Sequence, residues 1–158
     1  MRSDLAGPLF LCTRSFPWYN GRTIHREELK ETRVDQKHHC QVLWAKNKYL
    51  VLSRSSNIYK EIREYLKQDQ VEVSQVEGLI QQALALPENR GQVSNDFQHI
   101  WGYFKKQATA EEKADFMLLL EKYQHGQASQ EDLIKGIQNL LERYPNRYLQ
   151  DSTLLGGQ

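Results

Sequence analysis

The chain has 158 residues, 39% of them hydrophobic, so one domain can bury a core without metal or disulfide cross-links. Its 21 Lys and Arg residues nearly balance its 20 Asp and Glu residues, and the net charge of +1 excludes a strong overall attraction to nucleic acid or anionic membranes. Any cationic binding surface must therefore be local.

Cysteine usage and apolar runs bear on the compartment. Cys12 and Cys40 show neither CxxC spacing nor a disulfide-framework pattern, which is typical of free thiols in a reducing compartment. The apolar run at residues 5–12 contains Pro8 and offers no small residue for cleavage, so it does not fit a signal peptide. No other run approaches the roughly 20 apolar residues of a membrane span. We expect a cytoplasmic protein that does not enter the membrane.

Residues 1–23 are predicted to form an irregular N-terminal arm, because prolines and glycines interrupt every regular pattern there. The arm also carries four aromatic residues: Phe10, Phe16, Trp18 and Tyr19. This number is high for a free tail, so part of the arm is expected to pack on the body. A partner-binding arm is the alternative.

Helical signals begin at residue 23. Apolar side chains at residues 42–52 occupy several sides of the helical wheel, which predicts a central helix over residues 23–53 with neighbours around it. Ser55 and Ser56 are candidate N-caps for a second helix.

Capping signals mark the later helices. Ser74 and Thr109 are each followed three residues later by Glu, so each predicts a capping box at a helix start. Ser129 is a candidate N-cap for the last long helix. Pro87 and Gly126 are expected to end the helices that precede them.

These signals predict an all-α fold, a single-domain helical bundle of about six helices joined by short loops. The helical domain is expected to span residues 24–151. Tyr148 and Leu149 are predicted to pack on it, and residues 152–158 to form a frayed tail.

The segment at residues 93–106 separates an apolar face from a polar face most sharply. Its apolar residues recur at the spacing of an amphipathic helix, which predicts a core-facing stripe. The stripe consists of Val93, Phe97, Ile100, Trp101 and Phe104.

The opposite face is the best candidate for a functional surface. Asn95, His99, Tyr103 and Lys106 are spaced i, i+4, i+8 and i+11, so they converge on one side of a helix. These side chains can stack on a nucleobase while holding a phosphate, or transfer a proton beside a small substrate. Gly102 in a helix interior suggests a close approach by a ligand or backbone. The alternative is that this face packs against another helix.

A second cationic candidate lies in the predicted central helix. Lys46 and Lys48 interrupt its apolar run, and Arg54 follows it. Lysines in such helices commonly extend their ammonium groups to the surface, and a cationic binding site is the alternative.

No metal site or cofactor is expected. His38, His39 and Cys40 are consecutive, so on a helix they point in different directions and cannot converge on one ion. The chain also lacks HExxH, P-loop, GxGxxG, GxSxG and paired-cysteine motifs.

The segments QHIWGYFKK and WAKNKYLVLSRSSNIYKEIR resemble the YbgA-like family over residues 35–150. His99, Gly102, Tyr103 and Phe104 match the family's H-x-x-G-Y-F signature, and Asn95 fits a position just upstream.

Other parts of the chain carry the same resemblance. Lys48 and Tyr59 match the family's second marked stretch, and the pattern that ends at Tyr148 and Leu149 also fits. Trp44, Asn47 and Arg54 depart from it: many relatives have His or Tyr at the first two places and His at the third.

The resemblance implies an accessory helical module. YbgA-like domains are often fused behind a thiouracil desulfidase-like domain, and such fusions are similar to enzymes that remove sulfur from thiolated uridine in transfer RNA. The leading hypothesis is therefore a module that binds tRNA or another structured RNA, beside a separate desulfidase-like protein. Lys48, Arg54, Lys106 and Lys105 would supply its phosphate contacts.

Two alternatives remain open, so whether the protein is an enzyme is undecided. One is a small enzyme in which His99 acts as acid or base, and Tyr103 and Lys48 position an anionic substrate. The other is a protein-interaction adaptor. If Lys48, Tyr59, His99 and Tyr103 line one cleft, a functional site exists; scattered positions would weaken the functional hypothesis.

Overall fold

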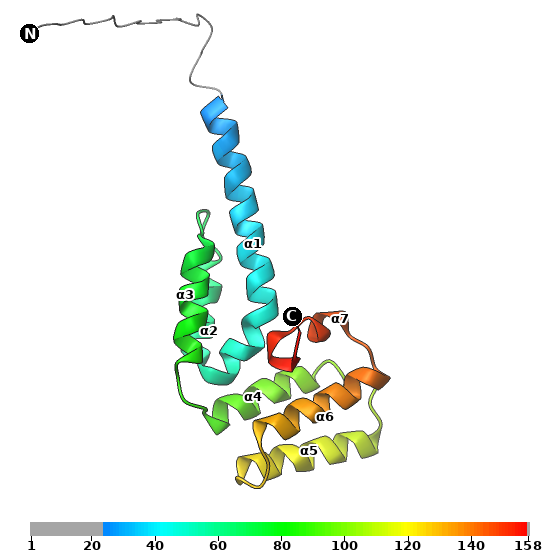
Figure 1. Cartoon of the computed structure of the whole chain (residues 1–158). Coiled ribbons are helices and arrows are strands. Elements are labelled where there is room, and N and C mark those ends of the chain that lie inside the picture. Colours follow the sequence, from blue (N-terminus) through cyan, green and yellow to red (C-terminus); the bar gives the residue numbers. More distant parts are fainter. Residues whose placement is uncertain (1–23, 158) are drawn as a thin grey trace, which may run out of the picture.

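The computed structural model describes the backbone of residues 24–157 and the side chains of residue 33 and residues 35–157. All regular structure in this part of the chain is helical, as predicted (Figure 1). The elements are α1 (Ile24–Arg54), α2 (Ser56–Tyr65), α3 (Val73–Leu84), α4 (Arg90–Trp101), α5 (Ala110–Gln124), α6 (Gln130–Arg143), α7 (Arg147–Gln150) and a 3₁₀ turn, η1 (Thr153–Leu155).

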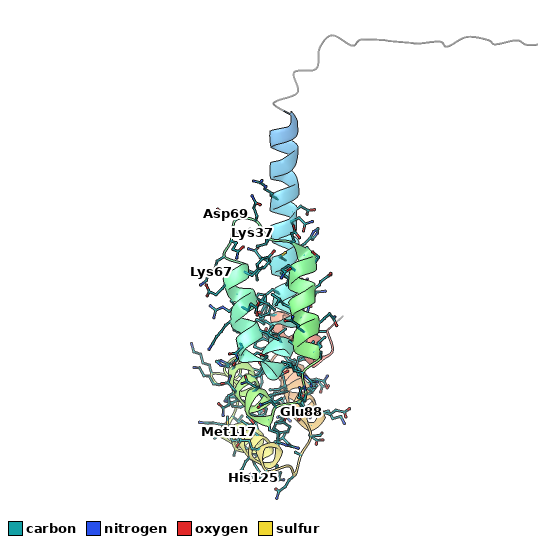
Figure 2. The ribbon with its side chains drawn as sticks, turned by 90° about the vertical axis from the view of Figure 1, so that its left-hand side faces the viewer. Lys37, Lys67, Asp69, Glu88, Met117 and His125 are labelled. Carbon is teal, nitrogen blue, oxygen red and sulfur yellow. The ribbon has the colours of Figure 1, made fainter. Side chains whose placement is uncertain are left out.

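The long helix α1 joins two packing units. Figure 1 shows α2 and α3 beside the C-terminal part of α1, and α4, α5 and α6 stacked across the end of that unit. In Figure 2, Lys37, Lys67 and Asp69 lie toward one end of the molecule, whereas Met117 and His125 lie toward the other. The predicted central helix is therefore confirmed, and its C-terminal half is the part shared by both units.

Each unit has its own cluster of buried side chains. The first joins α1, α2 and α3 through side chains such as Val51, Ile62 and Val76. The second joins α4, α5, α6 and the last turns, with Phe97 and Ile137 fully buried. Tyr49 of α1 belongs to the second cluster, so α1 contributes to both.

Most predicted helix ends are confirmed. Ser55 caps α2 by accepting a hydrogen bond from the backbone N–H of Ile58. Thr109 forms the predicted capping box at the start of α5, and Ser129 caps α6. Gly126 follows α5 with φ of +77°, a conformation that glycine adopts without steric cost.

Two helix boundaries were wrong. Helix α3 begins at Val73, and its N-cap is Glu72 without a side-chain cap, so the capping box predicted at Ser74 does not form. Helix α4 covers residues 90–101 rather than 93–106, because Asn89 caps it earlier and the chain then continues in turns.

The last residues pack against the body, which differs from the expected fray. Leu154 and Leu155 of η1 are buried. The hydroxyl of Thr153 donates to the backbone oxygen of Lys46, 3.1 Å away, and contacts Oδ1 of Asn47 at 3.0 Å. These contacts thus hold the C-terminal turn against α1.

The predicted arm at residues 1–23 lies outside the described residues. Within the described helices, none combines the length and apolar character that crossing a bilayer requires.

Candidate functional site

Five of the seven predicted site residues share one pocket between α1, α2 and α4. Its volume is about 540 Å³. The predicted residues in its lining are Lys48, Tyr59, Asn95, His99 and Tyr103, and the others are Tyr49, Leu52, Ser56, Lys60 and Arg63. We call this the cationic pocket.

Helical spacing brings these side chains together. Lys48 and Leu52 lie one turn apart on α1. Ser56, Tyr59, Lys60 and Arg63 follow i, i+3, i+4 and i+7 spacing on α2. The sharp connection at Ser55 places these two helical faces next to each other.

The third wall comes from α4. Asn95 and His99 lie one turn apart on the helix, and Tyr103 continues their line although α4 has already ended at Trp101. Tyr103 is 38% exposed, and the residues at 95 and 99 are also exposed. Asn95 and His99 of the predicted polar face are therefore exposed toward the pocket, whereas Tyr103 also contacts α1 and α7.

The lining is strongly one-sided in charge. It contains three cationic side chains, Lys48, Lys60 and Arg63, and no Asp or Glu. A cluster of one sign in a hollow attracts counter-charged ligands locally even when the whole protein is nearly neutral. This cationic surface is local, as the near-neutral net charge requires of any such surface in this chain.

Two tyrosines of the lining, Tyr49 and Tyr103, pack against Tyr148 of α7, which lies outside the lining. Rings of Tyr49 and Tyr148 lie 6.4 Å apart, and those of Tyr103 and Tyr148 are stacked at 6.2 Å. The ammonium of Lys48 lies 4.7 Å from the ring centre of Tyr49 and 4.5 Å from that of Tyr148. These cation–π contacts fix the position of the ammonium without neutralising its charge.

A hydrogen bond joins the pocket to the core. The hydroxyl of Tyr49 donates to the hydroxyl of Tyr103, 2.9 Å away. Burial, followed by this bond to Tyr103, raises the pKa of Tyr49 well above its ordinary value, so its phenol stays protonated. Tyr49 is 5% exposed, so its ring belongs to the core while its oxygen reaches the lining.

A second aromatic surface lies toward α2. The ring of Tyr59 packs on Trp44 of α1 at 5.1 Å, and the guanidinium of Arg63 lies 5.8 Å from the same tyrosine ring. Trp44, which departs from the pattern of YbgA-like sequences, therefore supports Tyr59 from behind. The pocket combines aromatic rings at two places with cations beside each.

Asp96 lies directly behind this lining and was missed as a functional residue. It is fully buried on α4, and both of its carboxyl oxygens lack a hydrogen-bond partner among the described residues. Burial raises its pKa to about 9, although nearby Lys48 acts in the opposite direction.

The sequence carried a signal for Asp96. It lies three residues after Val93 and four before Ile100, so it falls on the apolar stripe itself. An acidic residue at a core position of a helix is uncommon and often marks a functional site.

Arg54 and Lys106 do not line the pocket. The guanidinium of Arg54 contacts the backbone oxygen of Leu86, 3.4 Å away, near the loop that leads to α4. Lys106 follows the end of α4, so the helical spacing that grouped it with Asn95 does not extend to it.

Gly102 also differs from the interpretation made from sequence. It is the C-cap of α4 with φ of −52°, not a residue inside a helix. A Cβ placed there would meet only backbone atoms of His99, with its oxygen at 3.0 Å. The glycine therefore reflects the tight end of the helix and not the approach of a ligand.

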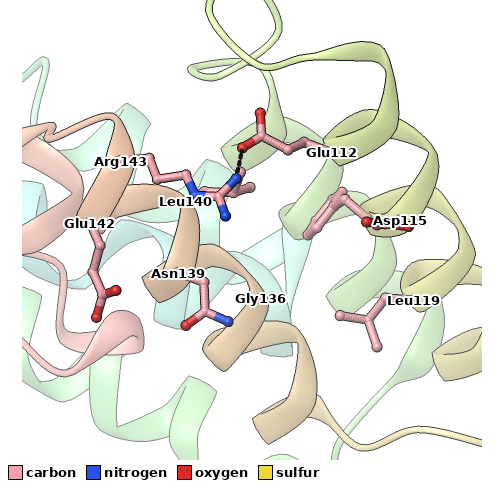
Figure 3. Close-up of a pocket in the computed structure, with 9 residues that line it drawn as sticks. Glu112, Asp115, Leu119, Gly136, Asn139, Leu140, Glu142 and Arg143 are labelled. Carbon is pink, nitrogen blue, oxygen red and sulfur yellow. Dashed lines mark hydrogen bonds and ion pairs between the residues drawn. The ribbon is translucent and has the colours of Figure 1, made fainter.

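A second depression lies between α5 and α6 (Figure 3). It has a volume of about 350 Å³ and an acidic lining, with Glu112, Asp115 and Glu142 against Arg143. We call it the acidic groove. None of the sequence-predicted site residues lines it.

The only cation of the acidic groove's lining already has a partner. Arg143 donates to Glu112 at 2.7 Å, as Figure 3 shows, and Tyr144 donates to the same carboxylate at 2.9 Å. The backbone N–H of Thr109 lowers the pKa of Glu112, and Arg143 and Tyr144 act in the same direction. This arrangement joins α5 to α6 and is an element of the fold.

Metal ligands do not converge in the described part of the chain: no group of three His, Cys, Asp or Glu side chains there is placed to hold an ion.

Comparison with known families identifies the family of this chain. The family described as "Protein of unknown function (DUF1722)" matches residues 48–157, more than two thirds of the chain. The chain belongs to this family. The match begins at Lys48 and contains every residue that lines the cationic pocket, together with Asp96 and Tyr148. Neither the curated proteins nor the solved structures contain a significant match.

Lys60, Arg63 and Tyr148 were also missed from sequence. Lys60 and Arg63 alternate with acidic residues on α2 and resemble an ordinary solvated face. Tyr148 lies about 100 residues from Lys48, and only the packing of α7 brings the two together.

Proposed function

We propose that the cationic pocket binds a phosphate-bearing nucleotide of a structured RNA, with tRNA as the leading candidate. One observation carries the proposal: three cations and several aromatic rings converge in one pocket that contains no carboxylate. RNA-binding proteins grip unpaired nucleotides by stacking bases on aromatic or guanidinium planes while cations contact the phosphates.

The arrangement assigns a part to each side of the pocket. Tyr59 with Arg63, and Tyr103, offer flat surfaces for bases. Lys48 and Lys60 supply charge for phosphates. Asn95 and His99 lie between these surfaces and can donate or accept hydrogen bonds at a base edge.

The YbgA-like resemblance suggests which kind of protein would act together with the pocket. It implies a domain that works beside a desulfidase-like protein, so we propose that the pocket presents transfer RNA to an enzyme that removes sulfur from thiolated uridine. The pocket supports the RNA-binding part of this proposal through its chemistry. The link to desulfuration depends on the resemblance alone.

Fluorescence anisotropy with labelled tRNA at low salt tests the proposal. The double variant Lys60→Glu/Arg63→Glu changes two exposed side chains of the pocket and should weaken binding about tenfold or more. The matched control Lys113→Glu/Lys122→Glu makes the same charge change on α5, away from the pocket, and should stay within about twofold.

Salt dependence provides a second readout. The slope of log affinity against log salt should become shallower by about 1–2 in the pocket variant and remain unchanged in the control. Equal losses in the two variants would indicate unspecific charge attraction. A lack of tRNA binding by the unaltered chain at low salt would contradict the proposal.

The second candidate function is a small enzyme that acts on an anionic substrate. It is favoured by the imidazole of His99, which is exposed in the pocket and engaged by no hydrogen bond or ion pair from the described residues. Nucleoside analysis of tRNA before and after incubation distinguishes the two. An altered nucleoside that disappears with His99→Ala indicates an enzyme, and unchanged nucleosides with intact binding indicate a binding module.

A further inference from the structure

Asp96 is the only acidic side chain that is buried in the described part of the chain. Its neighbours on the same face of α4, Val93 and Ile100, are fully buried, so its carboxyl group enters the core behind Asn95 and His99. Neither carboxyl oxygen has a hydrogen-bond partner among the described residues. A buried polar group without a partner reduces stability, so its presence requires another reason.

The ionisable groups around Asp96 come mainly from α1. Lys48 and Tyr49 are the residues whose charge interactions with Asp96 are significant. Tyr49 in turn interacts with Tyr103, after α4, and Tyr148, on α7. His99 on the same helix points to solvent.

The remaining elements contribute little charge to this core. From α5, α6 and η1 the surrounding cluster takes apolar side chains and one phenol, Tyr123, whose hydroxyl donates to Glu88 at 2.5 Å. Lys48 is therefore the cation whose charge acts on Asp96.

Lys48 does not form an ion pair with Asp96. No carboxyl oxygen of Asp96 lies within 4.0 Å of its ammonium, which instead rests on the rings of Tyr49 and Tyr148. Because burial raises the pKa of Asp96 to about 9, the carboxyl group is neutral at physiological pH. The pocket thus keeps the full charge of Lys48, although an acidic residue lies close behind it.

We propose that Asp96 is a positioning residue that selects anionic ligands: it remains an uncharged acid behind Lys48 and so leaves the ammonium free to bind a phosphate or similar oxyanion. An ionised Asp96 would reduce the positive potential around Lys48 and repel the ligand. Anion binding and the protonation of Asp96 therefore favour each other. This inference rests on the proposed function only in requiring that the pocket takes an anion, not that the anion belongs to RNA.

Carbon-13 NMR of the full chain labelled at aspartate carboxyl carbons tests this coupling directly. Asp96→Asn identifies the signal by its loss. We expect its titration midpoint near pH 9, moving upward by about half a unit or more when sulfate replaces chloride at equal ionic strength. Sulfate is the probe because it does not titrate in this range.

Two lysine variants separate coupling from a general salt effect. Lys48→Met should abolish the sulfate-dependent shift, whereas the matched variant Lys113→Met on α5 should retain it. A midpoint near 4, a midpoint that sulfate does not move, or a sulfate effect that survives Lys48→Met would each overturn the proposal.

Asp96→Asn provides an independent measurement, since its amide mimics the neutral acid. Sulfate affinity, followed by the chemical shifts of pocket residues, should be within about twofold of the unaltered protein at pH 7. Between pH 7 and 9.5 the unaltered protein should lose about two- to fourfold more affinity than the variant, because only about a quarter of Asp96 is then protonated. Parallel losses would overturn the inference.

These results are distinguishable from failure of the proposed function. A sulfate-dependent shift without tRNA binding would support the role of Asp96 and contradict the RNA-binding function. Binding of tRNA without any effect of sulfate on Asp96 would do the reverse.

Discussion

The cationic pocket and the acidic groove are both hollows between helices, but their polar groups are used differently. In the groove, Glu112 accepts hydrogen bonds from Arg143 and Tyr144, so the one cation of the lining is already paired. In the pocket, Lys60 and Arg63 have no carboxylate beside them in the lining. The Arg143–Glu112 pair that the fold has already formed indicates a contact between helices, whereas three cations without a carboxylate in the lining indicate a place for an anionic ligand.

Apolar contacts beneath the groove should give the largest effect on stability. Phe116 lines the groove, is 4% exposed and stacks on Trp101 with ring centres 5.0 Å apart. Phe116→Ala should lower the free energy of unfolding by about 3–5 kcal/mol, measured by urea denaturation, because it leaves a cavity in the core. A decrease in the free energy of unfolding below about 1 kcal/mol would show that the side chains beneath the groove contribute little to the packing of the core.

Asp96→Asn should change stability in the opposite direction. At pH 7 the folded protein must keep Asp96 neutral, whereas the unfolded chain gains free energy by ionising it. Removing the ionisable group should therefore raise the free energy of unfolding by about 2–4 kcal/mol at pH 7.

The pH dependence of the same variant checks the sign. The pKa of Asp96 rises from 3.8 to about 9 on folding, so its contribution to stability is fully present below pH 3.8 and is lost as the pH rises toward 9. In this window the free energy of unfolding of the unaltered protein should decrease relative to that of Asp96→Asn by up to about 1.4 kcal/mol per pH unit. Urea denaturation of both proteins at several pH values measures this difference. Parallel curves would mean that Asp96 is ionised in the folded protein.

Thr109→Ala tests the polar contacts of the acidic groove at the start of α5. The substitution removes the capping box of α5, in which Thr109 and Glu112 exchange two hydrogen bonds. It should lower the free energy of unfolding by about 1 kcal/mol and leave sulfate and tRNA binding unchanged. Weaker ligand binding with an intact fold would indicate that the groove takes part in recognition.

The smallest effect on stability is expected at the pocket rim. Lys60 is exposed, so Lys60→Gln should change the free energy of unfolding by less than about 0.5 kcal/mol while weakening anion binding. Arg143→Gln is its counterpart in the groove, and it should lower the melting temperature without affecting anion binding. The reverse pattern would contradict the functional distinction between the two hollows.

The fold was largely predictable because its signals are local. Ser55, Thr109 and Ser129 mark helix starts through hydrogen bonds within one turn. The start of α3 was mispredicted, since Glu72 occupies the cap without such a bond and the helix begins at Val73, which packs on the cluster shared with α1.

The site was predictable where one helix supplies it. Asn95 and His99 could be grouped from their spacing alone, and the family pattern added Lys48 and Tyr59. Tyr148 could not be found in this way, because its contact with Lys48 depends on the path of the chain through α5 and α6. The near-neutral net charge also concealed Lys60 and Arg63, since acidic residues elsewhere offset them.

Tyr49 connects the pocket to the core, because its ring packs among buried side chains while its hydroxyl bonds to Tyr103 in the lining. A ligand that holds Tyr103 in place should therefore also restrain the C-terminal half of α1. Amide hydrogen exchange in this half of the helix should slow on occupancy, even at positions that no ligand atom touches. Slower exchange of buried amides in α1 would then indicate that the cationic pocket is occupied.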